Sequence, residues 1–210
     1  ITKLADIYTV AASQDPAHPQ ALVKEARELT ARLLQTDANS YDGHRLEGQL
    51  DLMQGDSAGA VKEFAAATRA KPDQTGLALA YFQALATNKQ SADAETLALS
   101  VIEKNKTFAP MYDLLYLSYM QQEQQVKAEQ ILKRKVEKNP RQASFLIQLA
   151  GHYLLTRRRE DLEAVIGRLA DEKRFPEGHL LAGDFFFFRA REFESARIQY
   201  EAGVKASPKE

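Results

Sequence analysis

The chain has 210 residues, enough for one ordinary domain or two small ones. Its 28 basic and 29 acidic side chains give a net charge of −1, which provides no reason to expect a nucleic-acid or anionic-membrane surface. The absence of cysteine excludes disulfides, thiolate metal sites and a thiol nucleophile. The sequence also contains no apolar run of about 18 residues that would suggest a membrane span.

The composition predicts an all-α protein. The chain holds 32 Ala and 25 Leu against 8 Val and 7 Ile, and Gly and Pro together number only 17. Good helix formers are thus abundant, whereas strand formers and helix breakers are scarce. Because the chain starts at Ile1 with no signal-peptide pattern, we expect a mature product or a piece of a longer chain.

The first forty residues predict an irregular helix pair or an N-terminal cap over 1–40. We expect a helix near Thr2–Ser13, a loop at Gln14–His18 and a second helix over Pro19–Thr36. Pro19 suits the first turn of that second helix, because a proline there loses no intrahelical hydrogen bond.

A repeat of 34 residues organises the rest of the chain. Small residues recur at Ala60, Ala94, Ala128 and Ala196, with Leu162 at the remaining site, and prolines recur at Pro72, Pro140 and Pro208. Two helices joined by a tight turn approach closely only where small side chains meet, and proline ends the second helix. The period divides the chain without gaps into five units: 41–74, 75–108, 109–142, 143–176 and 177–210.

The best unit resembles the tetratricopeptide repeat (TPR), a pair of antiparallel helices. Its matching residues are Gly48, Gly55-Asp56, Ala60, Phe64, Ala67 and Pro72-Asp73. The resemblance implies an α-solenoid of about twelve helices, coiled as a right-handed superhelix. Phe82 and Asp184 depart from it, because a small residue is usual at both positions, and Gly183 beside Asp184 suggests a local shift.

In TPR proteins the first helix of each unit lines a concave groove that binds partners. Carried over position by position, the predicted groove residues are Arg45, Gln49, Met53, Leu79, Gln83, Asp113, Leu117, Met120, Ile147, Leu154, Phe185 and Phe188. The apolar character of this set favours a partner segment. Alternatively, the superhelix closes on itself, or the register is off by one at Phe185–Phe188. Only Arg45 with Gln49 resembles half of the clamp that binds chaperone tails, which disfavours that role.

A basic stretch offers a second possible surface. Between Lys127 and Arg174 there are 12 basic and 7 acidic residues, and the possible basic face is Lys133, Arg134, Arg157, Arg158 and Arg159. A solvated face paired with Glu129, Glu137 and Glu160 is the favoured interpretation, and docking to an acidic partner or to RNA is the alternative. A pI near 6.5 argues against RNA.

We expect no catalytic, cofactor-binding or metal-binding residues, and therefore no enzyme. The four histidines form no metal-ligand spacing, and neither a glycine-rich phosphate loop nor a His-Glu-x-x-His pattern occurs. The sequence instead predicts a scaffold for a protein or peptide partner. The alternative is a structural or assembly segment of a larger bacterial envelope protein that spaces domains or self-associates, with the C-terminal end presenting Tyr200 and Val204. The composition resembles bacterial TPR proteins, including exported ones, which favours a periplasmic or exported location over a cytoplasmic one.

Overall fold

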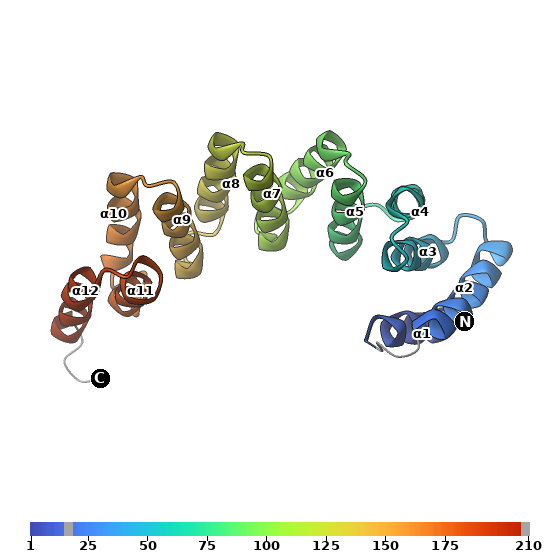
Figure 1. The fold of residues 1–210 in the computed structure, drawn as a ribbon, viewed down its shortest axis with the longest axis horizontal. Coiled ribbons are helices and arrows are strands. Elements are labelled where there is room, and N and C mark those ends of the chain that lie inside the picture. Colours follow the sequence, from blue (N-terminus) through green and yellow to red (C-terminus); the bar gives the residue numbers. More distant parts are fainter. Residues whose placement is uncertain (15–18, 207–210) are drawn as a thin grey trace. The chain divides into compact units, whose positions relative to one another are not determined.

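The computed structural model describes residues 1–14 and 19–206, which form helices and turns without a strand (Figure 1). The predicted all-α class is confirmed, and twelve α-helices occur within these ranges. The predicted loop at Gln14–His18 lies outside the described residues apart from Gln14, and so does Pro208.

The chain forms two compact units, Ile1–Ser118 and Tyr119–Glu210, whose boundary falls within helix α7. The first unit contains α1 (Thr2–Gln14), α2 (Pro19–Thr36), α3 (Tyr41–Met53), α4 (Ser57–Ala70), α5 (Thr75–Thr87), α6 (Ser91–Lys104) and most of α7 (Ala109–Gln121). The second contains α8 (Gln125–Lys138), α9 (Ala143–Leu155), α10 (Arg159–Gly167), the 3-10 turn η1 (Arg168–Ala170), α11 (Gly178–Asp184), the π-helical segment η2 (Phe185–Ala190) and α12 (Phe193–Ala206).

The turns that join paired helices recur with the same backbone conformation. Gly55, Lys89, Glu123, Arg157 and Arg191 follow one another at intervals of 34 residues, and each has a φ between 57° and 80°. This left-handed conformation reverses the chain tightly, but it is unfavourable for every residue with a Cβ atom. Four of these five turns therefore carry backbone strain that only the first avoids.

Small residues let the paired helices approach, as the sequence predicts. A Cβ atom on Gly48 of α3 would lie 2.6 Å from the ring of Phe64 on α4, and Ala60 and Ala67 are fully buried beside that ring. In the next pair the sizes are exchanged, because Phe82 and Ala98 occupy the equivalent positions and both are buried. The weak match at Phe82 thus preserves the volume between the two helices.

Capping differs among the helices. The side chain of Ser40 accepts a hydrogen bond from the backbone N–H of Gly43 at 3.2 Å, and that of Asp56 accepts one from Gly59 at 2.8 Å. These bonds satisfy N–H groups that have no partner within α3 and α4. Gln74 and Gln90 precede α5 and α6 without such a bond.

The last helix pair is out of register by one residue. The buried residues of α9 include Leu149, Ala150, His152 and Tyr153, whereas those of α11 and η2 include Ala182, Gly183, Phe185 and Phe186, 33 residues later. A π-helical turn accommodates one extra residue, and Arg191 then follows Arg157 by 34 residues again. The local shift that Gly183 suggests is confirmed, because a Cβ atom on Gly183 would clash with the ring of Tyr200.

Candidate functional site

Two predicted groove residues of α3 are engaged within the chain. The guanidinium group of Arg45 donates a hydrogen bond to Asp6 of α1 at 2.7 Å and another to Gln49 at 3.2 Å. The ion pair with Asp6 joins the first helices of two successive pairs. It also offsets the charge of Arg45, which weakens any resemblance to a carboxylate clamp.

The other predicted residues of the first unit differ in exposure. Met53, Gln83 and Leu117 are exposed on α3, α5 and α7, and Leu117 retains 54% of its accessible surface. Leu79 and Asp113 are half-buried. An exposed leucine and methionine on first helices are apolar surface available to a partner.

The second unit carries more exposed apolar surface on its first helices. Leu155, at the end of α9, is 66% exposed and Phe188, in η2, is 62% exposed. The predicted groove residues Met120, Ile147 and Leu154 are half-buried. Because α9 packs against η2, the exposed ends of these two elements are neighbours.

Phe185 does not occupy a surface position. Its side chain is only 2% exposed, so the ring belongs to the core and is not available to a partner. The reason is the one-residue shift described above, which turns Phe185 inward and Phe187 outward. The register of the Phe185–Phe188 run therefore differs from the predicted one. Phe187 and Phe188 occupy the repeat positions that Leu154 and Leu155 occupy in the preceding helix pair.

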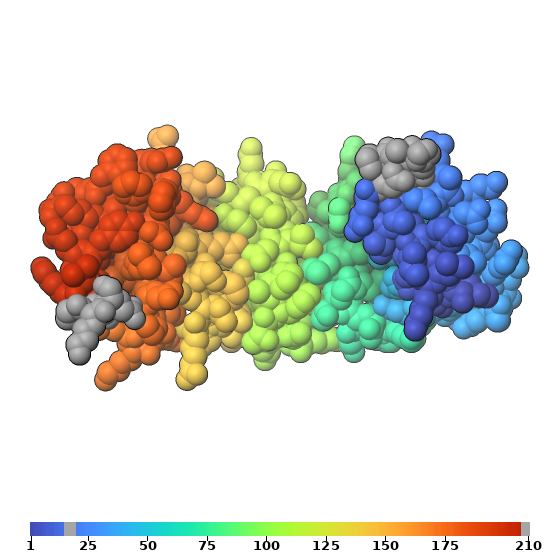
Figure 2. All heavy atoms as spheres, turned by 90° about the horizontal axis from the view of Figure 1, so that it is seen from below, coloured from blue at the N-terminus to red at the C-terminus, as the bar shows by residue number. Residues whose placement is uncertain are grey.

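Three exposed phenylalanines form a cluster that we call the aromatic patch: Phe187, Phe188 and Phe193. The ring of Phe187 lies edge-on between the other two, at centroid distances of 4.9 Å to Phe188 and 5.2 Å to Phe193. Side chains of α11, η2 and α12 (orange to red) lie at the surface in Figure 2. Edge-to-face packing holds these rings in a fixed arrangement while leaving much of their area exposed.

The basic residues are largely paired with acids, as the favoured interpretation expects. Lys133 contacts Glu129 at 2.6 Å, and Arg158 pairs with both Glu129 and Asp161. Burial alone would raise the pKa of Glu129, but hydrogen bonds from Lys133, Tyr153 and Arg158 outweigh it and lower the pKa to about 2.

The remaining predicted partners of the basic residues differ in part. Arg159 pairs with Glu163 and Glu192, not with Glu160, and Glu137 pairs with Lys138. Arg157 differs from its two neighbours, because its side chain makes no hydrogen bond or ion pair among the described residues.

The C-terminal helix uses Tyr200 internally. Its ring packs on Gly183, and its hydroxyl donates a hydrogen bond to Asp184 at 2.8 Å. Val204 on the same helix is exposed, so of the two residues predicted at this end only Val204 presents its side chain fully to solvent.

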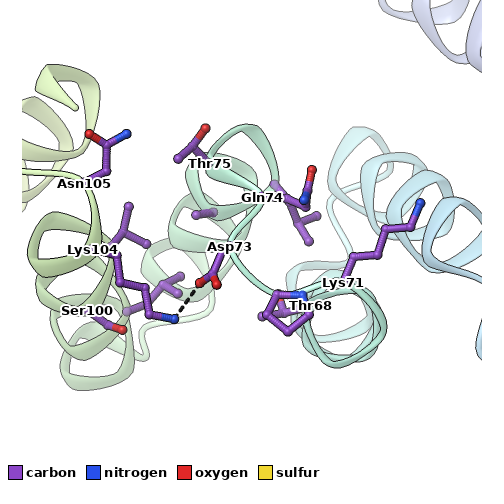
Figure 3. A pocket seen from close by; sticks show the side chains of 13 residues that line it. Thr68, Lys71, Asp73, Gln74, Thr75, Ser100, Lys104 and Asn105 are labelled. Carbon is purple, nitrogen blue, oxygen red and sulfur yellow. Dashed lines mark hydrogen bonds and ion pairs between the residues drawn. The ribbon is translucent and has the colours of Figure 1, made fainter. Parts of the chain in front are cut away.

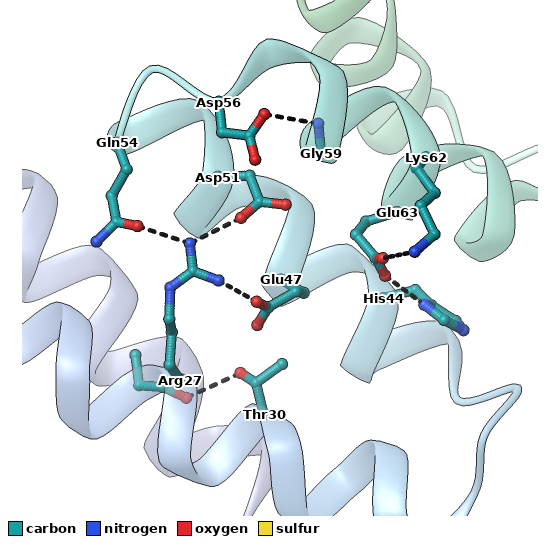
Figure 4. Close-up of polar contacts among 11 residues, drawn as sticks. Arg27, Thr30, His44, Glu47, Asp51, Gln54, Asp56, Gly59, Lys62 and Glu63 are labelled. Atoms are coloured by element: carbon teal, nitrogen blue, oxygen red, sulfur yellow. Dashed lines mark hydrogen bonds and ion pairs between the residues drawn. The ribbon is translucent and has the colours of Figure 1, made fainter.

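Polar contacts that the sequence does not predict join helices of the first unit (Figure 4). Arg27 of α2 donates to Asp51 at 2.7 Å and to Gln54 at 2.8 Å, and it also pairs with Glu47. Burial raises the pKa of Glu47, although Arg27 opposes that shift. The partners lie at least 20 residues from Arg27 in sequence, so no local pattern could identify them.

A second polar contact joins α3 to its neighbours (Figure 4). One ring nitrogen of His44 lies 2.6 Å from the Glu63 carboxylate of α4, and the other lies 3.0 Å from the carbonyl oxygen of Ala38. This imidazole connects two helices and the preceding loop, which gives it a structural role.

A surface cavity of about 510 Å³ lies between the C-terminal ends of α4 and α6 and the start of α5 (Figure 3). Lys104 and Asp73 form an ion pair of 2.5 Å across it. The lining mixes small polar and apolar side chains. Its acidic, basic and hydroxyl side chains do not form the linked set of acid, base and nucleophile that is typical of a catalytic site.

No group of three or more His, Asp or Glu side chains within residues 1–14 and 19–206 could hold a metal ion. In the same ranges, every helix is too short or too polar to cross a membrane. His152 is buried in α9, where burial lowers its pKa, and it packs edge-on against Tyr153.

Solved structures of TPR proteins are similar to this chain. The pilF protein of Pseudomonas aeruginosa matches 99% of this chain and 94% of its own at a TM-score of 0.57 and 14% identity. MamA from Desulfovibrio magneticus RS-1 matches 84% and 94% at a TM-score of 0.54 and 19% identity. YrrB, described as a TPR protein with an unusual peptide-binding site, matches 87% and 94% at a TM-score of 0.50 and 12% identity.

The likeness shows the fold that the sequence predicts: an α-solenoid of TPR helix pairs. No protein-family model and no curated sequence matches the chain. Because TPR folds serve many processes, function must be argued from the exposed residues of this chain.

Proposed function

We propose that this protein is a protein–protein interaction scaffold that binds a peptide or helix of a partner on its first helices. The observation that carries the proposal is the exposed apolar surface of the second unit, where Leu155 and Phe188 lie on neighbouring elements and are 66% and 62% exposed. Large apolar side chains that gather at a rigid surface are typical of binding sites.

The energetics are adequate for a specific partner. Full burial of a Leu or Phe side chain contributes about 1.5–3 kcal/mol. Two such anchors on the second unit offset a substantial part of the cost of association. Leu117 and Met53 offer similar anchors in the first unit.

Affinity capture from a lysate of the source organism tests the proposal. The wild type is compared with Leu117→Glu/Leu154→Glu, which places charges on the predicted surface of each unit. The matched control is Ala92→Glu/Ala164→Glu, which adds the same charges at exposed positions of α6 and α10. Circular dichroism establishes that each variant remains helical.

We expect at least one protein to be retained by the wild type and the control but lost with Leu117→Glu/Leu154→Glu. Equal retention by all three would contradict the proposed surface.

Self-association is the second candidate, because α1 exposes Leu4, Ile7 and Val10 on the side away from its buried Ala5 and Ala12. A helix normally covers such residues with a packing partner. If α1 joins two copies, light scattering will detect a dimer that Ile7→Glu converts to a monomer. A wild-type monomer at high concentration would contradict this candidate.

A further inference from the structure

Three arginines beside the aromatic patch have no partner within the described residues. Arg189 lies in η2, Arg191 follows it, and Arg157 is the equivalent turn residue after α9. All three are exposed, and none of their side chains forms a hydrogen bond or an ion pair in the part of the chain that the structure describes. The other two arginines nearby, Arg159 and Arg197, are each paired with two glutamates.

The acidic side chains around the patch mostly have hydrogen-bond or ion-pair partners already. Asp184 accepts a hydrogen bond from Tyr200, Glu192 pairs with Arg159, and Glu194 pairs with Arg197. Glu160, in the first turn of α10, is the exception, because its side chain forms no ion pair with another described residue. Among the charged side chains at this surface, Arg157, Arg189 and Arg191 therefore remain available to pair with a partner.

The position of Arg189 relates this charge to the apolar surface. Its Nη1 atom lies 3.5 Å from the place that a Cβ atom on Gly151 would occupy. The guanidinium group therefore lies over a part of α9 that has no side chain, one turn before the exposed Leu155. A planar cation at this place is accessible for hydrogen bonds to a carboxylate.

Two of the three unpaired arginines are turn residues. Arg157 and Arg191 both have left-handed backbone conformations, with φ of 57° and 59°, in the turns after α9 and η2. Arg191 is two residues from Phe193, whose ring packs against Phe187. Aromatic rings and free cations thus share one surface of the second unit.

We propose that this surface binds an acidic segment of a partner protein, in which Asp or Glu side chains flank a large apolar residue. The apolar residue packs on the aromatic patch, and the carboxylates pair with Arg189 and with Arg191 or Arg157. The inference rests on the proposed function and specifies the chemistry of its partner. The complementarity follows from the arginines, because an acidic segment supplies the partners that residues 1–14 and 19–206 do not.

Selection from a random peptide library tests the inference. The peptides are about 12 residues long, and an extended peptide of this length can cross several helices. The wild type selects the peptides, and fluorescence anisotropy then measures their affinity for each variant. Arg189→Glu/Arg191→Asp reverses the two charges, with Asp chosen because it tolerates the left-handed conformation. Arg168→Glu/Lys173→Asp makes the same charge change in the same unit, after the far end of α10.

We expect the selected peptides to be rich in Asp, Glu and large apolar residues. Their Kd rises about tenfold with Arg189→Glu/Arg191→Asp, since two favourable ion pairs become repulsive, and changes little with the control. Their affinity also falls as salt is added. Phe188→Glu removes binding by taking away the apolar contact.

The outcomes separate the two proposals. Peptides that require Phe188 but carry no excess of acid, or that bind Arg189→Glu/Arg191→Asp as well as the wild type, would overturn the acidic partner while leaving a peptide-binding surface. A selection that yields no peptide dependent on Phe188 would overturn both for this surface. Self-association that Phe188→Glu abolishes would show that a second copy is the occupant, which also overturns the inference.

Discussion

Replacing the strained turn residues with glycine tests the repeat geometry most simply. Lys89 and Glu123 have φ values of 60° and 58°, are exposed, and form no side-chain interaction among the described residues. The first turn of the series uses Gly55, with φ of 80°. We expect Lys89→Gly/Glu123→Gly to stabilise the protein and Lys89→Ala/Glu123→Ala not to.

The magnitude follows from two opposing effects. A residue with a Cβ atom pays about 1–2 kcal/mol in the left-handed conformation. Glycine avoids this cost but loses about 0.5–1 kcal/mol through the greater freedom of the unfolded chain. The net gain is therefore about 0.5 kcal/mol at each turn.

The alanine variant loses the same side chains and charges but keeps the strain. Glycine should exceed alanine by about 1 kcal/mol over the two sites, equivalent to a Tm difference of about 2–4 °C for a chain of this size.

Thermal unfolding followed by circular dichroism measures this difference. Because both variants remove one positive and one negative charge, electrostatic effects cancel in the comparison. A glycine variant that melts at or below the alanine variant would refute the assignment of left-handed turns at these two positions.

Three further predictions concern packing and charge. Ala128→Leu should destabilise the protein by about 1–3 kcal/mol through overpacking of a fully buried position, as measured by chemical denaturation. Gly183→Ala should cost a similar amount because its methyl group meets the Tyr200 ring, whereas Gly76→Ala, where nothing lies nearby, should not. Glu129→Gln should cost about 1–2 kcal/mol at neutral pH, after allowance for solvent screening. Since the folded pKa of about 2 lies below the ordinary 4.5, that difference should be complete above pH 4.5 and vanish as the pH approaches 2. A difference independent of pH would contradict the carboxylate's role.

Much of the fold was predictable because it depends on local, periodic signals. Second helices begin at Ser57, Ser91, Gln125, Arg159 and Phe193, each 34 residues after the one before, in phase with the small residues. Pro19 marks the start of α2 as predicted. Because such signals recur in every unit, a helix boundary predicted wrongly in one unit can be corrected from the same position in the others.

The candidate site was less predictable because a single residue of register decides which face a side chain occupies. The sequence places both Phe185 and Phe188 on the surface, but the one-residue shift that begins in α11, and that the π-helical turn compensates before Arg191, turns Phe185 inward. Four consecutive phenylalanines give no polar residue with which to tell the two faces apart. Gly183 was the one useful signal, since it indicates where a large side chain of α12 must fit.

Charge pairing was unpredictable for a different reason. Arg157, Arg158 and Arg159 are identical neighbours in the sequence, yet of the three only Arg157 lacks a partner in the part of the chain that the structure describes. Their partners come from other helices, such as Glu129 and Glu192, and depend on the packing of whole helix pairs. A sequence pattern shows that the stretch is basic but not which charges remain available.

Site-specific photocrosslinking tests the central claim, that the exposed apolar surface of the second unit binds a partner. A photoreactive phenylalanine analogue replaces Phe188 in one protein and Ile198 in another. Ile198 is a matched control, because it is also exposed but lies about 140° around α12 from Phe193. After irradiation in a lysate of the source organism, we expect a discrete crosslinked protein from position 188 and none from position 198. Crosslinks of equal strength at both positions, or only at 198, would contradict it.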